Sequence, residues 1–223
     1  MSKPLSGQLF LVTGASRGLG AALAPLLAAA GARLVLLART TGGLEEVDDL
    51  VQAAGGEATL VPLDITDGAG IDRLGQALYE RWGRLDGLAA CHGTLGTLAP
   101  AGHIEPRVWE EVLAVNLTAS WRLIRALDPL LRAAPAGRAA FATCAVAAGE
   151  WPYWGAYAAA KAGLEALVRA YAGETRSAGL KVELFDPGPM RTALRAAAFP
   201  GEPPESQPAP GAAAARLAAL LGA

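Results

Sequence analysis

Short apolar runs alternate with longer segments of mixed polarity from residue 8 to residue 186. The apolar runs predict six β-strands, at 8–13, 33–38, 58–64, 85–91, 137–143 and 180–186. The segments between them are long enough for helices, which we expect at 21–30, 43–54, 67–82, 107–131 and 152–176. Strands that alternate with helices of this length are typical of βαβ units. The pattern therefore predicts an α/β fold with a six-stranded, doubly wound parallel sheet.

The alternation ends after the sixth predicted strand. Residues 189–208 are rich in proline and polar at their end, which indicates a substrate lid or a flexible loop. The alanine-rich tail, 212–223, predicts one more short helix. We find no internal repeat and no second domain, so we expect one domain over residues 1–223. Pro25 is the main local objection to the first predicted helix, and tertiary packing must compensate for its cost.

Charge and composition narrow the range of partners. The chain has 19 basic and 21 acidic residues and a pI near 5.7, with no basic tract, which argues against nucleic acid binding. No apolar stretch approaches the roughly 20 residues that a membrane span needs, and a signal-peptide pattern is missing. Two cysteines and two histidines occur without CxxC or HxxxH spacing, which argues against a metal site. We expect a cytoplasmic protein with free thiols.

A glycine-rich turn, TGASRGLG at 13–20, follows the first predicted strand and opens the first helix. Gly14, Gly18 and Gly20 let the backbone approach a ligand, and the helix N-terminus offers unpaired N–H groups to a phosphate. The spacing is G-x3-G-x-G, which differs from the general dinucleotide fingerprint G-x-G-x-x-G. Its place between strand and helix predicts a dinucleotide pyrophosphate site.

Tyr157 and Lys161 are four residues apart in a predicted helix, so their side chains lie on one face. An ammonium close to a phenol favours the phenolate and lowers a pKa that starts at about 10. Tyrosine can then exchange a proton with a carbonyl or an alcohol near neutral pH. Alone, such a pair is more typical of an ordinary surface helix, and the other motifs make it a candidate for chemistry.

Together these motifs resemble those of a classical short-chain dehydrogenase/reductase. TGASRGLG is similar to that family's TGxxxGxG loop, the pair Tyr157 and Lys161 to its YxxxK, and Asn116 in VNLTAS to its helix asparagine. The segment PGPMRT, 187–192, resembles its PGxxxT, and the resemblance covers about residues 8–200. It implies a single Rossmann-type domain that interconverts a carbonyl and an alcohol by hydride transfer with a nicotinamide cofactor.

The resemblance also implies roles for individual residues. Tyr157 would be the acid/base, Lys161 its electrostatic partner and a contact of the nicotinamide ribose, and Asn116 the support of a water. Alone, Asn116 fits a polar residue on a solvated helix face equally well. The implied cofactor contacts are Gly14, Ser16, Arg17, Gly18, Leu19, Gly20, Arg39, Asp64, Ile65, Cys91, Gly93, Tyr157, Lys161, Pro187, Gly188 and Thr192.

The choice between NAD(H) and NADP(H) depends on the end of the second predicted strand. An acidic residue there would bind the ribose hydroxyls and repel a 2′-phosphate. Arg39 follows a small neutral residue there instead, and Arg17 lies in the glycine loop, so two guanidiniums can converge on a phosphate. The alternative is a pair of solvated surface arginines. We expect NADP(H) in preference to NAD(H).

The chain departs from the family at the end of the fifth predicted strand, where Cys144 occupies the position of the usual serine. A thiol is a much weaker donor than a hydroxyl, and loss of a strong donor to developing charge costs orders of magnitude in rate. Thr143 carries a hydroxyl but points to the opposite strand face, so it replaces the serine only if the strand bends. We expect Cys144 among the catalytic residues. The alternative is a weakened or inactive NADP-binding module for binding or sensing.

The family's NNAG becomes Ala90-Cys91-His92-Gly93 at the end of the fourth predicted strand. Cys91 replaces the asparagine that braces the sheet in the family, and His92 is either a packed loop residue or a proton relay. The family's usual seventh strand is also missing. We therefore expect a homodimer, through the helices at 107–131 and 152–176, rather than a tetramer.

Three aromatic residues, Trp151, Tyr153 and Trp154, precede Tyr157. They fit the wall of an apolar substrate pocket, and they fit an interface or the core as well. Neither these residues nor the predicted lid identifies the small-molecule carbonyl or alcohol substrate.

Overall fold

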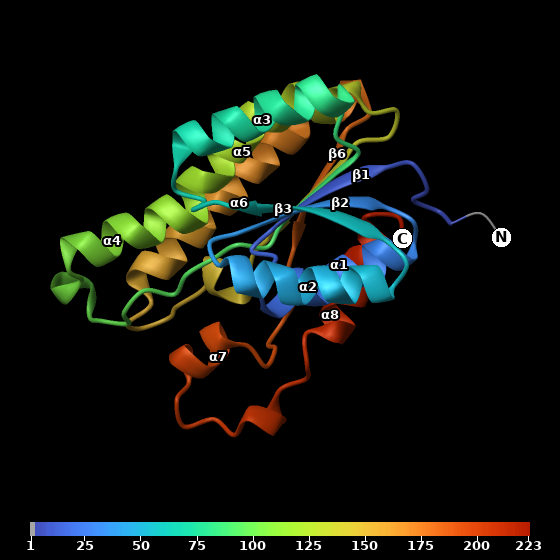
Figure 1. Ribbon diagram of the computed structural model, residues 1–223. Coiled ribbons are helices and arrows are strands. Elements are labelled where there is room, and N and C mark those ends of the chain that lie inside the picture. Colours follow the sequence, from blue (N-terminus) through green and yellow to red (C-terminus); the bar gives the residue numbers. More distant parts are fainter. Residues whose placement is uncertain (1–2) are drawn as a thin grey trace.

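The computed structural model describes residues 3–223, which form a central sheet with helices on both faces (Figure 1). The sheet has six strands in the order β3-β2-β1-β4-β5-β6, and all neighbouring strands are parallel. The strands are β1 (Leu9–Thr13), β2 (Arg33–Ala38), β3 (Glu57–Pro62), β4 (Gly87–Ala90), β5 (Arg138–Ala142) and β6 (Lys181–Phe185). The predicted six-stranded, doubly wound sheet is confirmed. Strand order reverses between β1 and β4, and in such sheets ligands bind at the carboxyl ends beside that point.

The helices form one layer on each face of the sheet, and each layer encloses its own core (Figure 1). One layer consists of α1 (Gly18–Ala29), α2 (Thr41–Ala53) and α8 (Gly211–Leu220), and the other of α3 (Gly68–Trp82), α5 (Ala119–Ala133) and α6 (Gly155–Thr175). Phe10 and Val12 of β1 belong to the first core, whereas Leu9 and Leu11 belong to the second. Burial of both faces explains why the strands are continuous apolar runs in the sequence. Single 3₁₀ turns occupy Ala101–His103, Ala145–Ala147, Arg176–Ala178 and Pro204–Ser206.

Helix α1 begins at Gly18, earlier than predicted, and continues through Pro25. It persists because Leu23 and Leu27 are fully buried, in the same core as Leu217 of α8. Burial of these side chains offsets the loss of one helical hydrogen bond. The predicted C-terminal helix exists as α8, and it packs directly on α1.

The single helix predicted at 107–131 is wrong in one respect. The chain forms two helices there, α4 (Pro106–Leu113) and α5, joined by a π-helical turn at Ala114–Thr118. The side-chain amide of Asn116 donates to the carbonyl of Val112 at 2.9 Å, and so competes with the backbone for that acceptor. π-Helical turns inside α-helices are frequent at functional sites.

After β6 the chain forms a segment that projects below the sheet in Figure 1 and returns at α8. It contains one short helix, α7 (Ala193–Ala198), and Thr192 caps that helix by accepting from the N–H of Arg195 at 3.2 Å. The guanidinium of Arg195 donates two hydrogen bonds of 2.7 Å to the carboxylate of Glu202, and Gln207 donates a third at 2.8 Å. The segment predicted as a lid or loop, 189–208, is therefore held together by its own side chains.

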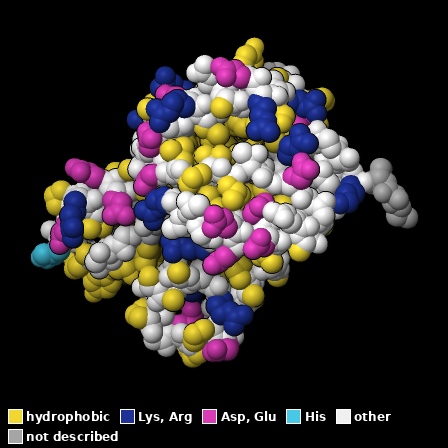
Figure 2. Space-filling model, in the orientation of Figure 1, with side chains coloured by type: hydrophobic (Ala, Val, Ile, Leu, Met, Phe, Trp, Pro, Cys, Tyr) yellow, Lys and Arg dark blue, Asp and Glu magenta, His cyan; other side chains and the backbone are white. Residues whose placement is uncertain are grey.

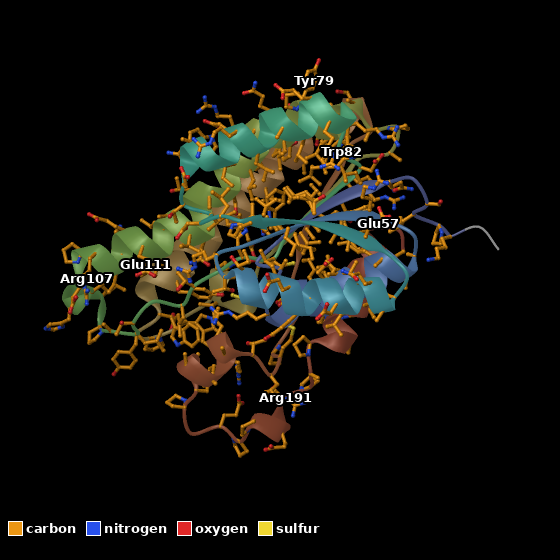
Figure 3. All side chains as sticks on the ribbon, viewed as in Figure 1. Glu57, Tyr79, Trp82, Arg107, Glu111 and Arg191 are labelled. Atoms are coloured by element: carbon orange, nitrogen blue, oxygen red, sulfur yellow. The ribbon has the colours of Figure 1, made fainter. Side chains whose placement is uncertain are left out.

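Charged and apolar side chains are interspersed over the face of the molecule shown in Figure 2. Figure 3 shows Arg191, on the projecting segment, on the opposite side of the sheet from Tyr79 of α3. Within residues 3–223, no helix is long and apolar enough to cross a membrane. The first two residues of the predicted 1–223 domain lie outside the described residues.

Candidate active site

The glycine loop lies at the carboxyl end of β1 and packs against the loop after β4. Gly14 has a φ of +64°, and a Cβ there would lie 2.9 Å from the carbonyl oxygen of Cys91. A Cβ on Gly20 would lie 2.5 Å from the carbonyl oxygen of Gly14, so the first turn of α1 also requires glycine. No side chain of the described residues caps the N-terminus of α1. Its first N–H groups therefore remain for an anion, and the loop fits the pyrophosphate of a dinucleotide.

The neighbouring corner of the sheet carries the residues expected to meet the adenosine end of a cofactor. Asp64 accepts hydrogen bonds from the backbone N–H of Thr66 at 2.9 Å and from its hydroxyl at 2.7 Å. The backbone bond is the main cause that lowers the pKa of this carboxyl, and the charge of Arg39 contributes. Arg39 is exposed beside Asp64, Arg17 is exposed in the glycine loop, and Ile65 is buried.

Leu19 and Ser16 of the glycine loop contact the surrounding helices. Leu19 is buried in the core beneath α1. A Cβ on Gly43 would lie 2.9 Å from Cβ of Ser16, so the start of α2 packs closely against the loop.

His92 connects the end of β1 to α5. Its Nδ1 lies 2.7 Å from the hydroxyl of Thr13 and its Nε2 3.3 Å from the hydroxyl of Ser120. Burial, helped by the charge of Lys161, lowers the pKa of His92 to about 3. The ring is therefore neutral near pH 7 and held from both sides, which supports the packing role and not the proton relay. Cys91 replaces the residue that braces the sheet in the family, and in this chain the hydrogen bonds that connect β1 to α5 come from the next residue, His92.

Tyr157 and Lys161 are both buried on α6, as a pair facing the sheet. The Nζ of Lys161 donates to the carbonyl of Ala142, the last residue of β5, at 2.8 Å. The same Nζ lies 5.7 Å from the centre of the Tyr157 ring, and a Cβ on Gly93 would lie 4.0 Å from it. The pair therefore lies at the carboxyl ends of β4 and β5, next to the glycine loop.

Burial controls the protonation of Tyr157. It raises the pKa of the phenol, and the neighbouring Cys144 thiol and Asp186 carboxyl raise it further. The sequence predicts that Lys161 lowers this pKa, and the structure gives the opposite direction. The reason is that desolvation disfavours the phenolate, while the ammonium is bound to the carbonyl of Ala142. Tyr157 is therefore a neutral phenol near pH 7.

Burial also lowers the pKa of Lys161, whereas negative charge on the neighbouring acidic groups, Cys144, Cys91 and Glu165, would raise it. The Cys91 thiol itself is desolvated, which raises its pKa to about 12. It is therefore a neutral thiol at physiological pH. Of the three groups near Lys161, Glu165 is the only carboxyl group, and it lies one helical turn after Lys161.

Asn116 is buried in the π-helical turn and faces the loop after β4. Its side-chain amide donates to the carbonyl of Thr94 at 2.8 Å, and its Oδ1 accepts from the N–H of Thr94 at 3.3 Å. A Cβ on Gly93 would lie 3.1 Å from that Oδ1. Asn116 therefore joins the site and connects the turn before α5 to the same loop that carries Gly93.

Thr143 and Cys144, the two candidates for the serine role, have different surroundings. The Thr143 hydroxyl donates to Oε1 of Glu165 at 2.7 Å, on the side of α6. Cys144 packs against the small core that contains Tyr157, and its proximity contributes to the raised pKa of the phenol. Thr143 is therefore engaged elsewhere, and Cys144 is the residue next to Tyr157.

The segment after β6 returns to the glycine loop. Gly188 has a φ of +73°, and its N–H donates to Oδ1 of Asp186 at 2.8 Å. The carbonyl of Pro187 accepts a hydrogen bond of 2.7 Å from an arginine of α8. The methyl of Thr192 lies 3.5 Å from where a Cβ on Gly18 would be. Thr192 therefore closes over the loop from the side of the projecting segment.

Trp154 lies half-buried between Tyr157 and the projecting segment. Its ring centre is 6.0 Å from that of Tyr157 and 5.7 Å from that of Phe199. Trp151 packs edge-on against Trp154 at 6.0 Å, and both Trp151 and Tyr153 are exposed. The aromatic cluster thus divides, because Trp154 joins Tyr157 to Phe199 while the other two face solvent.

Three further residues, which were not predicted from the sequence, join this site: Ser120, Glu165 and Phe199. Ser120 and Glu165 lie four residues after Asn116 and Lys161, so polar residues at that helical spacing are a usable signal. Phe199 comes from a segment without periodicity and meets Trp154 only through the tertiary fold.

Comparison with known proteins identifies the family. The sequence profile described as short chain dehydrogenase matches residues 8–203. An uncharacterized oxidoreductase of Escherichia coli K12, YciK, is 34% identical over 209 residues, which are 92% of this chain and 82% of that protein. The chain therefore belongs to the short-chain dehydrogenase family of oxidoreductases.

Solved structures of short chain dehydrogenases have a fold similar to that of this protein over the full length of the chain. A short chain dehydrogenase structure from Pseudomonas syringae has a TM-score of 0.95 and 34% identity, and covers 100% of this chain and 92% of its own. One from Shigella flexneri 2a, solved in complex with NADP, has a TM-score of 0.94 and 33% identity, and covers 100% and 94%. The fold is thus the Rossmann-like, nucleotide-binding fold of this family.

Proposed function

We propose that this protein is an NADP(H)-dependent oxidoreductase that interconverts a small-molecule carbonyl and an alcohol, with Tyr157 as the acid/base. The observation that carries the proposal is the convergence of the glycine loop, buried Lys161 and Tyr157 at one edge of the sheet. When bound, the nicotinamide would supply or accept the hydride. The chain itself would bind the cofactor, orient the substrate and move the proton.

Tyr157 would donate the proton during reduction. Because burial raises its pKa, the phenol keeps its proton near neutral pH and is ready to transfer it to a carbonyl oxygen that gains charge. The Lys161 ammonium would stabilise the phenolate that remains. In the reverse reaction the same group would take the proton from the alcohol, after the phenol has first lost its own proton.

Cys144 would take the position of the usual donor to the substrate oxygen. Its thiol donates only weakly, so we expect turnover slower than a hydroxyl would allow. Asn116 is engaged with Thr94, and in this proposal it supports a water near Lys161 while it holds that loop.

NADP(H) is the proposed cofactor, in preference to NAD(H). Exposed Arg39 beside Asp64 and exposed Arg17 support this choice, because guanidiniums suit a 2′-phosphate. The relative from Shigella flexneri was solved with NADP, which is consistent with it. The proposed cofactor contacts are the individual residues predicted from the sequence, of which Gly14 is the first and Thr192 the last.

We further propose one domain over residues 1–223, with 189–208 as the substrate lid, acting in the cytoplasm as a homodimer. The contact of Trp154 with Phe199 supports the lid, because it joins that segment to Tyr157. The exposed Trp109 of α4 and Trp121 of α5 support an interface on the helices proposed for the dimer.

The second candidate is a module that binds NADP(H) without turnover, and Cys144 is the observation that favours it. The test has two stages. NADPH is titrated by nicotinamide fluorescence, and the complex is then mixed with a panel of ketones and aldehydes while NADPH oxidation is followed. A reductase binds NADPH and oxidises it with at least one carbonyl. Binding without oxidation identifies the module, and failure to bind NADPH contradicts both.

A further inference from the structure

Glu165 is a largely buried carboxylate on α6 to which the proposed reaction gives no role. Its side chain is 15% exposed. Its Oε1 accepts a hydrogen bond of 2.7 Å from Thr143, and its other oxygen pairs with Arg169. The Arg169 side chain is 65% exposed, whereas Thr143 is buried. Ion pairs with exposed partners contribute little to stability, so the contact with Thr143 is the one that matters here.

The contact with Thr143 is one of two adjacent tethers between β5 and α6. The carbonyl of Ala142 accepts from Nζ of Lys161 at 2.8 Å, and the hydroxyl of Thr143 donates to Glu165 at 2.7 Å. Two successive residues are thus bound to two successive turns of one helix. Cys144 is the next residue along, so these tethers fix the backbone from which it extends.

The charge of Glu165 also acts on Lys161. Burial lowers the pKa of this ammonium, and Glu165 is a carboxylate whose charge opposes the effect. The other groups that face Lys161 are Cys144 after β5, Cys91 and His92 after β4, and Tyr157 on α6. Cys91, His92 and Tyr157 are neutral near pH 7, since burial raises the first and third pKa and lowers the second.

We infer that Glu165 is a positioning residue for the reductase site. Through Thr143 it fixes the end of β5, so that Cys144 stays beside Tyr157, and its charge favours the ammonium form of Lys161. The kinetic consequences rest on the proposed reductase function, whereas the effect on Lys161 can be measured without turnover. The tether also engages the Thr143 hydroxyl, so that this group is bound to Glu165.

The kinetic test uses variants of Glu165 and Thr143, with Arg169→Gln as the matched control. Glu165→Gln should lower kcat about tenfold with little change in KM, because the contact orients reacting groups. It should also move the high-pH limb of kcat downward, because loss of a nearby negative charge lets burial lower the pKa of Lys161 further. Thr143→Val should lower kcat without moving the limb, and Thr143→Ser should keep the wild-type value. Arg169→Gln should change kcat by less than about twofold.

A double-variant cycle separates the tether from two unrelated effects. If Glu165 and Thr143 act through one contact, Glu165→Gln with Thr143→Val should cost little more than the larger single change. Full additivity of the two losses in kcat would contradict the inference. So would a Glu165→Gln protein with a lower melting temperature but an unchanged kcat and pH limb.

A binding measurement distinguishes failure of this inference from failure of the proposed function. The pH dependence of NADPH affinity, read by fluorescence, should show the same downward shift in Glu165→Gln, because Lys161 is a proposed ribose contact. If wild type oxidises no NADPH yet this limb moves, the reductase proposal fails and the role of Glu165 stands. If the limb does not move, the role of Glu165 fails. Should Glu165→Gln not fold, Glu165→Asp takes its place: it should keep the limb and lose kcat, and wild-type values for both would overturn the inference.

Discussion

The cofactor side and the substrate side of this site are built from different parts of the chain. On the cofactor side, Gly14 and Gly20 meet backbone at distances that leave no room for a side chain. On the proposed substrate side, Cys144 packs against the core that contains Tyr157, and Trp154 meets Phe199 of the segment after β6. In the proposed function, cofactor binding would depend on backbone geometry that the fold preserves, whereas turnover would depend on side chains that can change without loss of the fold. We expect strong NADPH binding beside slow turnover.

The largest effect that separates the two sides is expected at Tyr157. Tyr157→Phe removes the proposed proton donor but keeps the ring that packs on Trp154, so kcat should fall about 10³-fold. The Kd for NADPH should change by less than about threefold, measured by fluorescence titration beside steady-state oxidation. Tyr153→Phe, at an exposed position, is the matched control and should keep both values. Loss of NADPH binding in Tyr157→Phe would show that the two sides are not separable.

His92 provides a pH-dependent test of the cofactor side. Its pKa is about 3 in the fold, against about 6.5 for an unfolded histidine. Between these values only the unfolded chain binds the proton, so stability is lost as the pH falls from about 6.5 toward 3. This residue should account for a loss of about 2 kcal/mol in unfolding free energy between about pH 7.5 and about pH 5.

Urea unfolding at the two pH values measures this contribution. His92→Gln should reduce the difference in unfolding free energy between them by most of that amount, whatever its own effect on stability. His103→Gln is the control, because His103 is exposed. An equal pH dependence in wild type and His92→Gln would contradict the neutral, buried brace between Thr13 and Ser120.

Arg39 tests what the cofactor side recognises. Arg39→Glu should lower the preference for NADPH over NADH about tenfold or more, because it replaces a phosphate partner with a charge that repels phosphate. The ratio of the two Kd values, from fluorescence titrations, gives the result. Arg81→Glu makes the same charge change at an exposed position on α3 and should leave the ratio unchanged. An unchanged ratio in Arg39→Glu would identify Arg39 as a solvated surface residue.

The smallest expected effect concerns the order in which the two cysteines react with an alkylating reagent. Burial raises the pKa of Cys91 to about 12, so alkylation by iodoacetamide should label Cys144 first. Bound NADPH should slow that labelling severalfold, because Cys144 lies beside the nicotinamide end in the proposed site. Mass spectrometry of the labelled peptides measures both outcomes. Preferential labelling of Cys91, or labelling that NADPH does not slow, would place the thiols differently.

The fold was predictable because a parallel sheet buried on both faces leaves a simple pattern. The predicted run 33–38 coincides with β2, and the other strands differ only at their ends. The break between α4 and α5 was not predictable, because it depends on contacts of Asn116 with Val112 and Thr94. Such contacts join the helix to a distant loop and leave no periodic signal.

The candidate site, like the fold, has features that were predictable from the sequence and features that were not. The glycine loop, Tyr157 and Lys161 could be proposed from the sequence, because each motif is short and the motifs together resemble those of one family. The direction of the Tyr157 pKa could not, because it follows from burial, which only the assembled fold determines. The contact between Thr143 and Glu165 was equally hidden, since it joins a strand end to a helix.

The most direct test of the difference between the two sides is the change Cys144→Ser, measured by single-turnover oxidation of bound NADPH with a carbonyl from the panel. Serine restores a strong donor beside Tyr157, so the rate should rise about 10- to 100-fold while the Kd for NADPH stays within about twofold. A rate that is unchanged or lower in Cys144→Ser, with NADPH bound as in wild type, would contradict the account of a site with intact cofactor binding and a weakened donor.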